Sequence, residues 1–71
     1  MAPTPERLQS LIMWQFHVTE QNHVSRYGMY NGEYYKQFLV DGKPQPAAYP
    51  PRKIPLVLYT TAQKRGTLLP R

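Results

Sequence analysis

Two histidines and one glutamate lie close together in the N-terminal third of the chain: His17, Glu20 and His23. On a continuous helix, each neighbouring pair would be three residues apart and would share a face. Imidazole and carboxylate groups bind metals, but a zinc site needs a fourth conventional ligand and a recognised spacing. The sequence offers neither, so we interpret these residues as a partly exposed polar face and predict no metal or other cofactor.

Side chains that could carry catalysis are equally sparse. The 71 residues include no cysteine, which excludes disulfides and a thiol nucleophile. The four carboxylates are scattered, so no acid and base pair stands out. Neither a Gly-x-Ser-x-Gly motif nor a phosphate-binding glycine loop is present. We therefore predict that the protein is not an enzyme.

The charge of the chain is unevenly distributed. Residues 42–71 carry six basic residues and no acidic one, whereas residues 1–41 carry three basic and four acidic residues. A basic segment that follows a nearly neutral one indicates contact with RNA, with acidic protein or with acidic lipid headgroups. We predict that four cations make these contacts with an anionic surface: Arg52, Lys53, Lys64 and Arg65.

The N-terminal segment predicts a helix over about residues 5–21. Thr4 can cap this helix, and Pro5 suits its first position. Apolar residues recur at helical spacing: Leu8, Leu11, Ile12 and Phe16. A strand pattern competes, because apolar residues also alternate along residues 12–18. We favour the helix. Trp14 would widen its apolar surface beyond one stripe, and we expect a partner to cover that surface.

Residues 24–40 are rich in tyrosine and allow a short helix or a hairpin. The Asn31-Gly32 pair is a strong hairpin signal, and a two-residue turn there would place Met29 opposite Tyr34 and Ser25 opposite Phe38. A helix would instead gather one apolar stripe: Tyr34, Tyr35, Phe38 and Leu39. The paired spacing of that stripe inclines us to the helix.

Six of the eight prolines of the chain lie after Gly42, so this segment is expected to be extended. The run "LVLYTT" (56–61) has high strand propensity, and we predict that it is extended and pairs with another chain. The predicted fold is therefore mainly α with extended segments and little independent core. Residues 1–41 would form a docking segment, and residues 42–71 a basic, proline-rich arm.

These features predict a non-catalytic accessory subunit that fastens neighbouring proteins in a large assembly, for which we expect a mitochondrial membrane-associated complex. The predicted interface consists of apolar and aromatic residues: Leu8, Leu11, Ile12, Trp14, Phe16, Tyr34, Tyr35, Phe38, Leu56, Leu58 and Tyr59. The alternative is a small ribosomal or other ribonucleoprotein subunit whose basic arm binds RNA. No apolar run approaches the ~20 residues that span a bilayer, and we recognise no cleavable signal.

Overall fold

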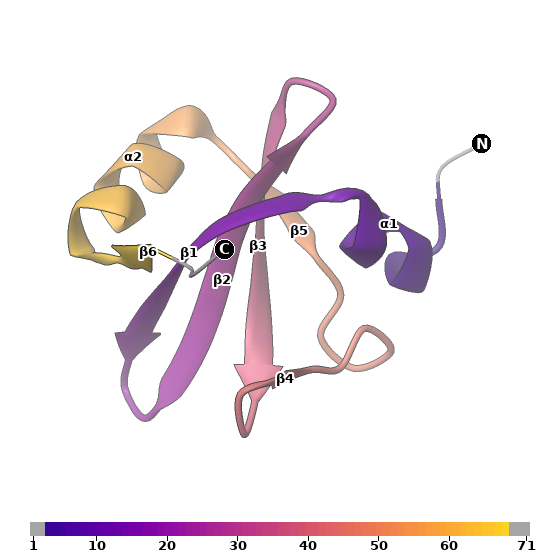
Figure 1. Ribbon diagram of the computed structural model, residues 1–71, viewed down its shortest axis with the longest axis horizontal. Coiled ribbons are helices and arrows are strands. Elements are labelled where there is room, and N and C mark those ends of the chain that lie inside the picture. Colours follow the sequence, from indigo (N-terminus) through magenta and orange to yellow (C-terminus); the bar gives the residue numbers. More distant parts are fainter. Residues whose placement is uncertain (1–2, 69–71) are drawn as a thin grey trace.

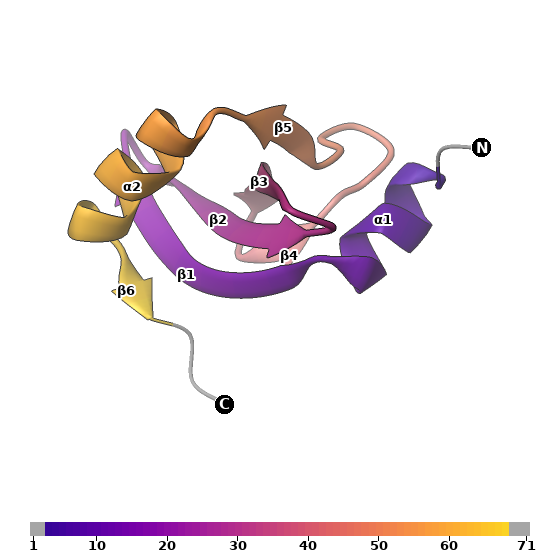
Figure 2. The same ribbon diagram turned by 90° about the horizontal axis from the view of Figure 1, so that it is seen from above.

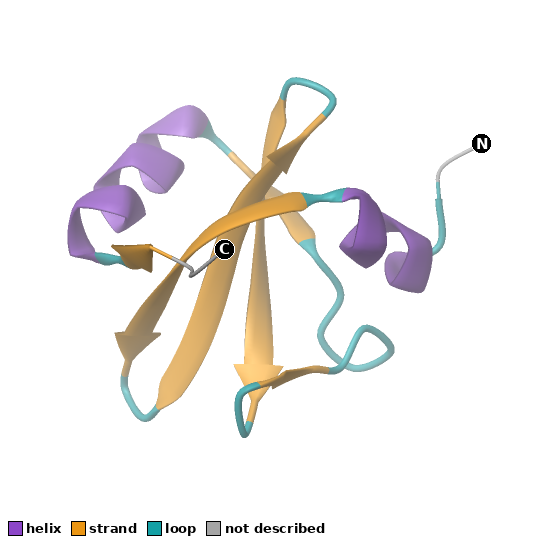
Figure 3. Cartoon of the chain, viewed as in Figure 1, coloured by secondary structure: helices purple, strands orange, loops and turns teal. Residues whose placement is uncertain are grey.

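The fold is built around three long antiparallel strands, β1 (Met13–Glu20), β2 (His23–Tyr30) and β3 (Glu33–Val40) (Figure 1, Figure 3). The computed structural model describes residues 3–68. Five short elements complete it: α1 (Pro5–Leu11), β4 (Lys43–Pro44), β5 (Arg52–Ile54), α2 (Leu56–Arg65) and β6 (Thr67–Leu68). The prediction of a mainly α fold was wrong, because the antiparallel sheet dominates the structure.

The C-terminal segment joins the sheet of its own chain and does not extend away from it as an arm. The strand order is β4-β3-β2-β1-β6, and β5 pairs with the first half of β3. Figure 2 shows the chain running from β5 through α2 to β6, so that α2 connects the two edges of the sheet. The strands therefore find hydrogen-bonding partners within residues 3–68. A chain without an independent core would need another molecule to supply those partners.

Residues 24–40 form the hairpin and not the helix that we favoured. Asn31 and Gly32 have φ values of 54° and 76°, the left-handed conformation that a type I′ turn requires. Met29 pairs with Tyr34 and Ser25 with Phe38, which confirms the register that the two-residue turn predicts. Local turn geometry therefore outweighed the helical spacing of the aromatic residues, since each of those residues also fits a half-buried strand position.

The predicted helix over residues 5–21 is real only as far as Leu11. The Thr4 side chain accepts a hydrogen bond from the Arg7 amide, as expected of a cap, and Pro5 begins the helix. Ile12 is extended, and the aromatic and β-branched residues that follow form β1. A bulge between Trp14 and Phe16 places these two side chains on opposite faces of the sheet, which a simple alternation does not predict.

The run at residues 56–61 is helical, so its predicted extended conformation was wrong. Pro55 precedes the first turn of α2, and Tyr59 and Ala62 are buried one turn apart on the side that faces the sheet. The Thr60 and Thr61 hydroxyls both donate hydrogen bonds to the Val57 carbonyl and so satisfy their polar groups within the helix. Packing of Tyr59 against the sheet thus overrides the strand propensity of the segment.

Aromatic rings form the core between the sheet and α2. Phe16 is 1% exposed, and its ring stacks on Tyr27 with centroids 5.1 Å apart. Tyr59 reaches down from α2 and meets Phe16 at 5.3 Å and Tyr34 at 4.5 Å. We call the face that carries these residues the α2 face. It provides the independent core that the sequence did not lead us to expect.

The opposite face, which we call the α1 face, packs against α1 and the loop that precedes β5. Ile12 is buried there beside Gly28, where an added Cβ would lie 2.7 Å from the Ile12 side chain and 2.5 Å from the Met13 carbonyl oxygen. Only glycine allows this close approach of β1 and β2. Burial on two faces explains how so short a chain forms a complete fold.

A buried polar network fastens α1 and the loop to the α1 face. The Gln37 side chain, 1% exposed, accepts bonds from Arg26 Nε at 3.0 Å and Nη2 at 2.8 Å. Its amide nitrogen donates to Gln9 Oε1 at 2.8 Å and to the Tyr49 carbonyl at 3.2 Å. The Arg26 guanidinium lies 4.0 Å from the Trp14 ring, whose indole nitrogen donates to the Gln9 carbonyl. One glutamine thus links α1, β2, β3 and the loop.

We predict that replacing Ser25 with alanine raises the free energy of unfolding by about 1 kcal/mol. The Ser25 hydroxyl is fully buried on the α2 face between Val18 and Phe38, and it has no hydrogen-bond partner among residues 3–68. Removing it relieves the desolvation of an unpaired polar group. Urea denaturation measures the change. A loss of stability on substitution would show that the hydroxyl is hydrogen-bonded, for example to a buried water.

Candidate binding surfaces

The histidines of the sequence do not form a metal site. His17 pairs with Arg26 and His23 with Glu20, which puts the two imidazoles on opposite faces of the sheet. No group of three metal-binding side chains occurs anywhere in the described part of the chain. His17 instead lies on the α1 face, where burial, reinforced by the Arg26 guanidinium, lowers the pKa of its imidazole.

This lowered pKa of His17 predicts a pH dependence of stability. The unfolded chain binds a proton at His17 below about pH 6.5, and the folded chain does so only at a lower pH. Stability present at neutral pH is therefore lost as the pH falls through the pKa of the folded state. We expect the melting temperature to fall less between about pH 7 and 5.5 in His17→Gln than in the unmodified protein. Parallel pH profiles of the two proteins would contradict this.

Four of the predicted interface residues are buried within the chain itself: Ile12, Phe16, Tyr35 and Tyr59. Four others are half-buried, namely Leu8, Trp14, Tyr34 and Phe38. Three remain exposed: Leu11, Leu56 and Leu58. In this conformation the sequence pattern thus identified core and surface apolar residues together, because both kinds of position favour the same side chains.

The exposed residues of the predicted interface that lie close together are in the first turn of α2. Leu56 is 54% exposed, Val57 65% and Leu58 53%. Three consecutive helical residues point in directions about 100° apart, so this turn exposes apolar side chains over more than half of its circumference. We call Leu56, Val57 and Leu58 the docking turn. Apolar side chains gathered in this way on a surface mark interaction sites more often than scattered single ones do.

Two further exposed apolar residues, Met13 and Met29, lie on the α2 face of the sheet. Met13 and Met29 are paired across β1 and β2, and Met29 is paired in turn with Tyr34. Tyr34 pairs with Ile54, which lies two residues before the docking turn. One row across four strands therefore begins with exposed methionines and ends next to α2. Methionine side chains adapt readily to the shape of a partner.

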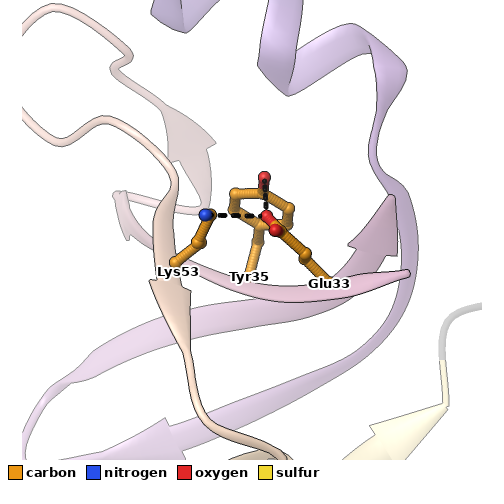
Figure 4. A network of polar contacts seen from close by, with 3 residues as sticks. All are labelled: Glu33, Tyr35 and Lys53. Atoms are coloured by element: carbon orange, nitrogen blue, oxygen red, sulfur yellow. Dashed lines mark hydrogen bonds and ion pairs between the residues drawn. The ribbon is translucent and has the colours of Figure 1, made fainter. Parts of the chain in front are cut away.

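The four predicted anion-contacting cations have different surroundings. Lys53 Nζ lies 3.0 Å from Glu33 Oε2, which also accepts a bond from the Tyr35 hydroxyl (Figure 4). The hydrogen bond from Lys53 lowers the pKa of Glu33 and raises that of Lys53. Arg52 pairs with Lys36 and so faces the other side of the sheet. Lys64 and Arg65 lie in the last turn of α2, so the structure does not bring the four together.

A hollow of about 520 Å³ is lined by residues of the turns at Asn22 and at Asp41-Gly42. In Figure 1 these turns lie at the end of the sheet away from the Asn31-Gly32 turn. The residues that line the hollow include Asn22, His23, Phe38, Val40, Asp41 and Tyr49. The Phe38 ring contacts His23 edge-on at 5.3 Å and Tyr49 at 6.4 Å. Lys36 Nζ lies 4.7 Å from the Phe38 centroid. This size is typical of a ligand-binding pocket.

Sequence reasoning missed most of these surface features. Val57 was not among the predicted interface residues, although its neighbours Leu56 and Leu58 were. The hollow was missed because its rings come from β2, β3 and the loop, which meet only in the folded chain. The Asp41-Gly42 pair was the available signal: it has φ values of 53° and 76° and forms a hairpin turn beside the hollow.

Within residues 3–68, neither helix has the length and apolar character needed to cross a bilayer. No family model, curated protein or solved structure matches the chain. The surfaces of the chain are therefore the features that bear on its function.

Proposed function

We propose that this protein is a non-catalytic docking subunit that binds another protein through the first turn of α2. The observation that carries the proposal is the exposure of three consecutive apolar side chains, Leu56, Val57 and Leu58. Burying such residues against a partner gains roughly 25 cal/mol for each Å² of apolar surface removed from water. The proposal keeps the predicted class of accessory subunit, while the mitochondrial setting stays a prediction from the sequence.

The charge around the docking turn indicates the kind of surface that it fits. No acidic residue occurs from Gly42 to the end of the chain, and α2 ends in Lys64 and Arg65. Arg52 and Lys53 precede the helix, although Lys53 is paired with Glu33. A partner with an apolar cleft and an acidic rim is complementary to this arrangement, because opposite charges at a rim steer and orient an encounter.

The compact fold changes how docking is expected to occur. An extended arm would order only on binding and would lose conformational entropy at that step. Here the docking turn is already held by Tyr59 and Ala62, which anchor α2 to the sheet. The protein therefore offers a pre-organised surface, and less of the binding free energy is spent on ordering.

Purification of the tagged chain from its natural cells under mild conditions tests this function. We expect a defined protein partner to be recovered in a constant ratio to the chain, and we expect Leu58→Asp to abolish that recovery. Recovery of the unmodified chain alone, as a monomer, would contradict the proposal. Recovery that Leu58→Asp leaves unchanged would move the interface away from α2.

A further inference from the structure

We propose that the hollow beside Phe38 binds single-stranded RNA, by stacking bases on its aromatic rings and holding phosphates at Lys36 and Arg52. This site is separate from the docking turn. In Figure 1 the first turn of α2 lies toward the upper end of the sheet, whereas the turns that border the hollow lie at its lower end. Substitutions in the hollow leave the docking turn intact, so failure of this inference is distinguishable from failure of the docking proposal.

The aromatic part of the site is accessible and held in place. Tyr49 is 46% exposed, so a large part of its side chain is open to a ligand. Its backbone is fixed, because the Tyr49 carbonyl accepts the hydrogen bond from Gln37. Phe38 holds the set together by its edge-on contacts with His23 and Tyr49. Unpaired bases stack on such rings, whereas bases within a duplex are already stacked on each other.

Two cations beside the hollow favour an anionic ligand on their side of it. Lys36 lies over the Phe38 ring and is paired across the strands with Arg52, so both cations belong to the α2 face beside the ring cluster. Phosphates gain from both cations and release bound counterions when they bind.

The polar edge of the hollow indicates RNA in preference to DNA. Asn22 and Asp41 line the hollow from two turns that meet at the same end of the sheet. The Asp41 carboxylate repels phosphate but accepts a hydrogen bond from a hydroxyl, and a ribose 2′-hydroxyl is the donor that distinguishes RNA from DNA. We therefore expect phosphates on the Lys36 side of the strand and ribose hydroxyls on the Asp41 side.

Fluorescence anisotropy with a labelled oligouridine of about eight nucleotides tests the site. We expect Tyr49→Leu to weaken binding about ten-fold through the loss of stacking. Lys36→Gln should weaken binding and reduce the salt slope by about one, as expected for one phosphate contact. The controls Tyr30→Leu and Arg7→Gln alter a tyrosine and a cation outside the hollow and should bind as the unmodified protein does. A thermal melt of each variant verifies that it is folded.

Further arms of the experiment separate the parts of the proposal. The deoxy form of the same oligonucleotide should bind more weakly, and Asp41→Gly, which tolerates the positive φ, should remove that preference. In nuclear magnetic resonance titrations of the unmodified protein, the largest shifts should fall at His23, Phe38 and Tyr49. Absence of binding at low salt, or equal losses in Lys36→Gln and Arg7→Gln, would overturn the site. Equal binding of both oligonucleotides would overturn the ribose contact.

Discussion

Replacing Gln37 with leucine is expected to lower the free energy of unfolding by about 3 kcal/mol. The substitution introduces an apolar side chain of similar size and removes the amide that accepts two bonds from Arg26 and donates to Gln9 and Tyr49. The Arg26 guanidinium would then be partly buried without that acceptor, and unpaired charged groups are costly. Urea denaturation measures the loss.

A matched substitution shows whether the loss of stability comes from the hydrogen-bond network of Gln37 or from the loss of any glutamine amide. Gln63→Leu removes an exposed glutamine of α2 and should change stability by less than about 0.5 kcal/mol. Trp14, the single tryptophan, offers a local probe, because its indole nitrogen donates to Gln9 and its ring lies against Arg26. A Gln37→Leu protein as stable as the unmodified one, with unchanged tryptophan fluorescence, would contradict the structural role given to Gln37.

The second large effect is expected at the docking turn, where Val57→Asp should weaken partner binding more than ten-fold. Val57 is the most exposed residue of this turn, so burying a carboxylate in its place at an apolar interface is unfavourable. The isolated protein should not be harmed. The first turn of α2 has no acidic residue and no side-chain cap, and an aspartate there interacts favourably with the helix dipole.

Val57→Asp is a sharp test because it should weaken partner binding without lowering the stability of the isolated protein. Competition binding reports the affinity for the partner, and a thermal melt reports stability. Thr60→Asp places the same charge on the exposed part of α2 outside the docking turn and should leave affinity nearly unchanged. A Val57→Asp protein that is unfolded would contradict the view that Val57 is free of the core, and equal affinity losses in both variants would indicate a general effect of charge.

The hairpin illustrates what local sequence could predict. Asn31-Gly32 specified the turn and therefore the register of β2 on β3, since the side-chain period of two leaves no freedom once a two-residue turn is set. The bulge that separates Trp14 from Phe16 had no such local signal. Its position is favoured by contacts on both faces, Ile12 against Gly28 on one and Phe16 against Tyr27 on the other.

The α2 segment illustrates what local sequence could not predict. Residues 56–61 have high strand propensity but form the start of α2, and the helix is stabilised by Tyr59, whose ring contacts Phe16, Tyr27 and Tyr34 from three different strands. Contacts between residues so distant in the chain leave no periodic trace in a short segment. The side chains of Leu56 and Leu58 are exposed in this chain, and the partner that would cover them stays a prediction.

The most direct test of the docking proposal is photocrosslinking from the docking turn in the natural cells of the protein. A photoreactive amino acid at position 57 should give one dominant adduct with a partner protein. The same group at position 60 or 63, farther along α2, should give little or none. Dominant adducts at position 57 alone would be the predicted result. Equal adducts from all three positions, or none from position 57, would contradict the assignment of the first turn of α2 as the docking site.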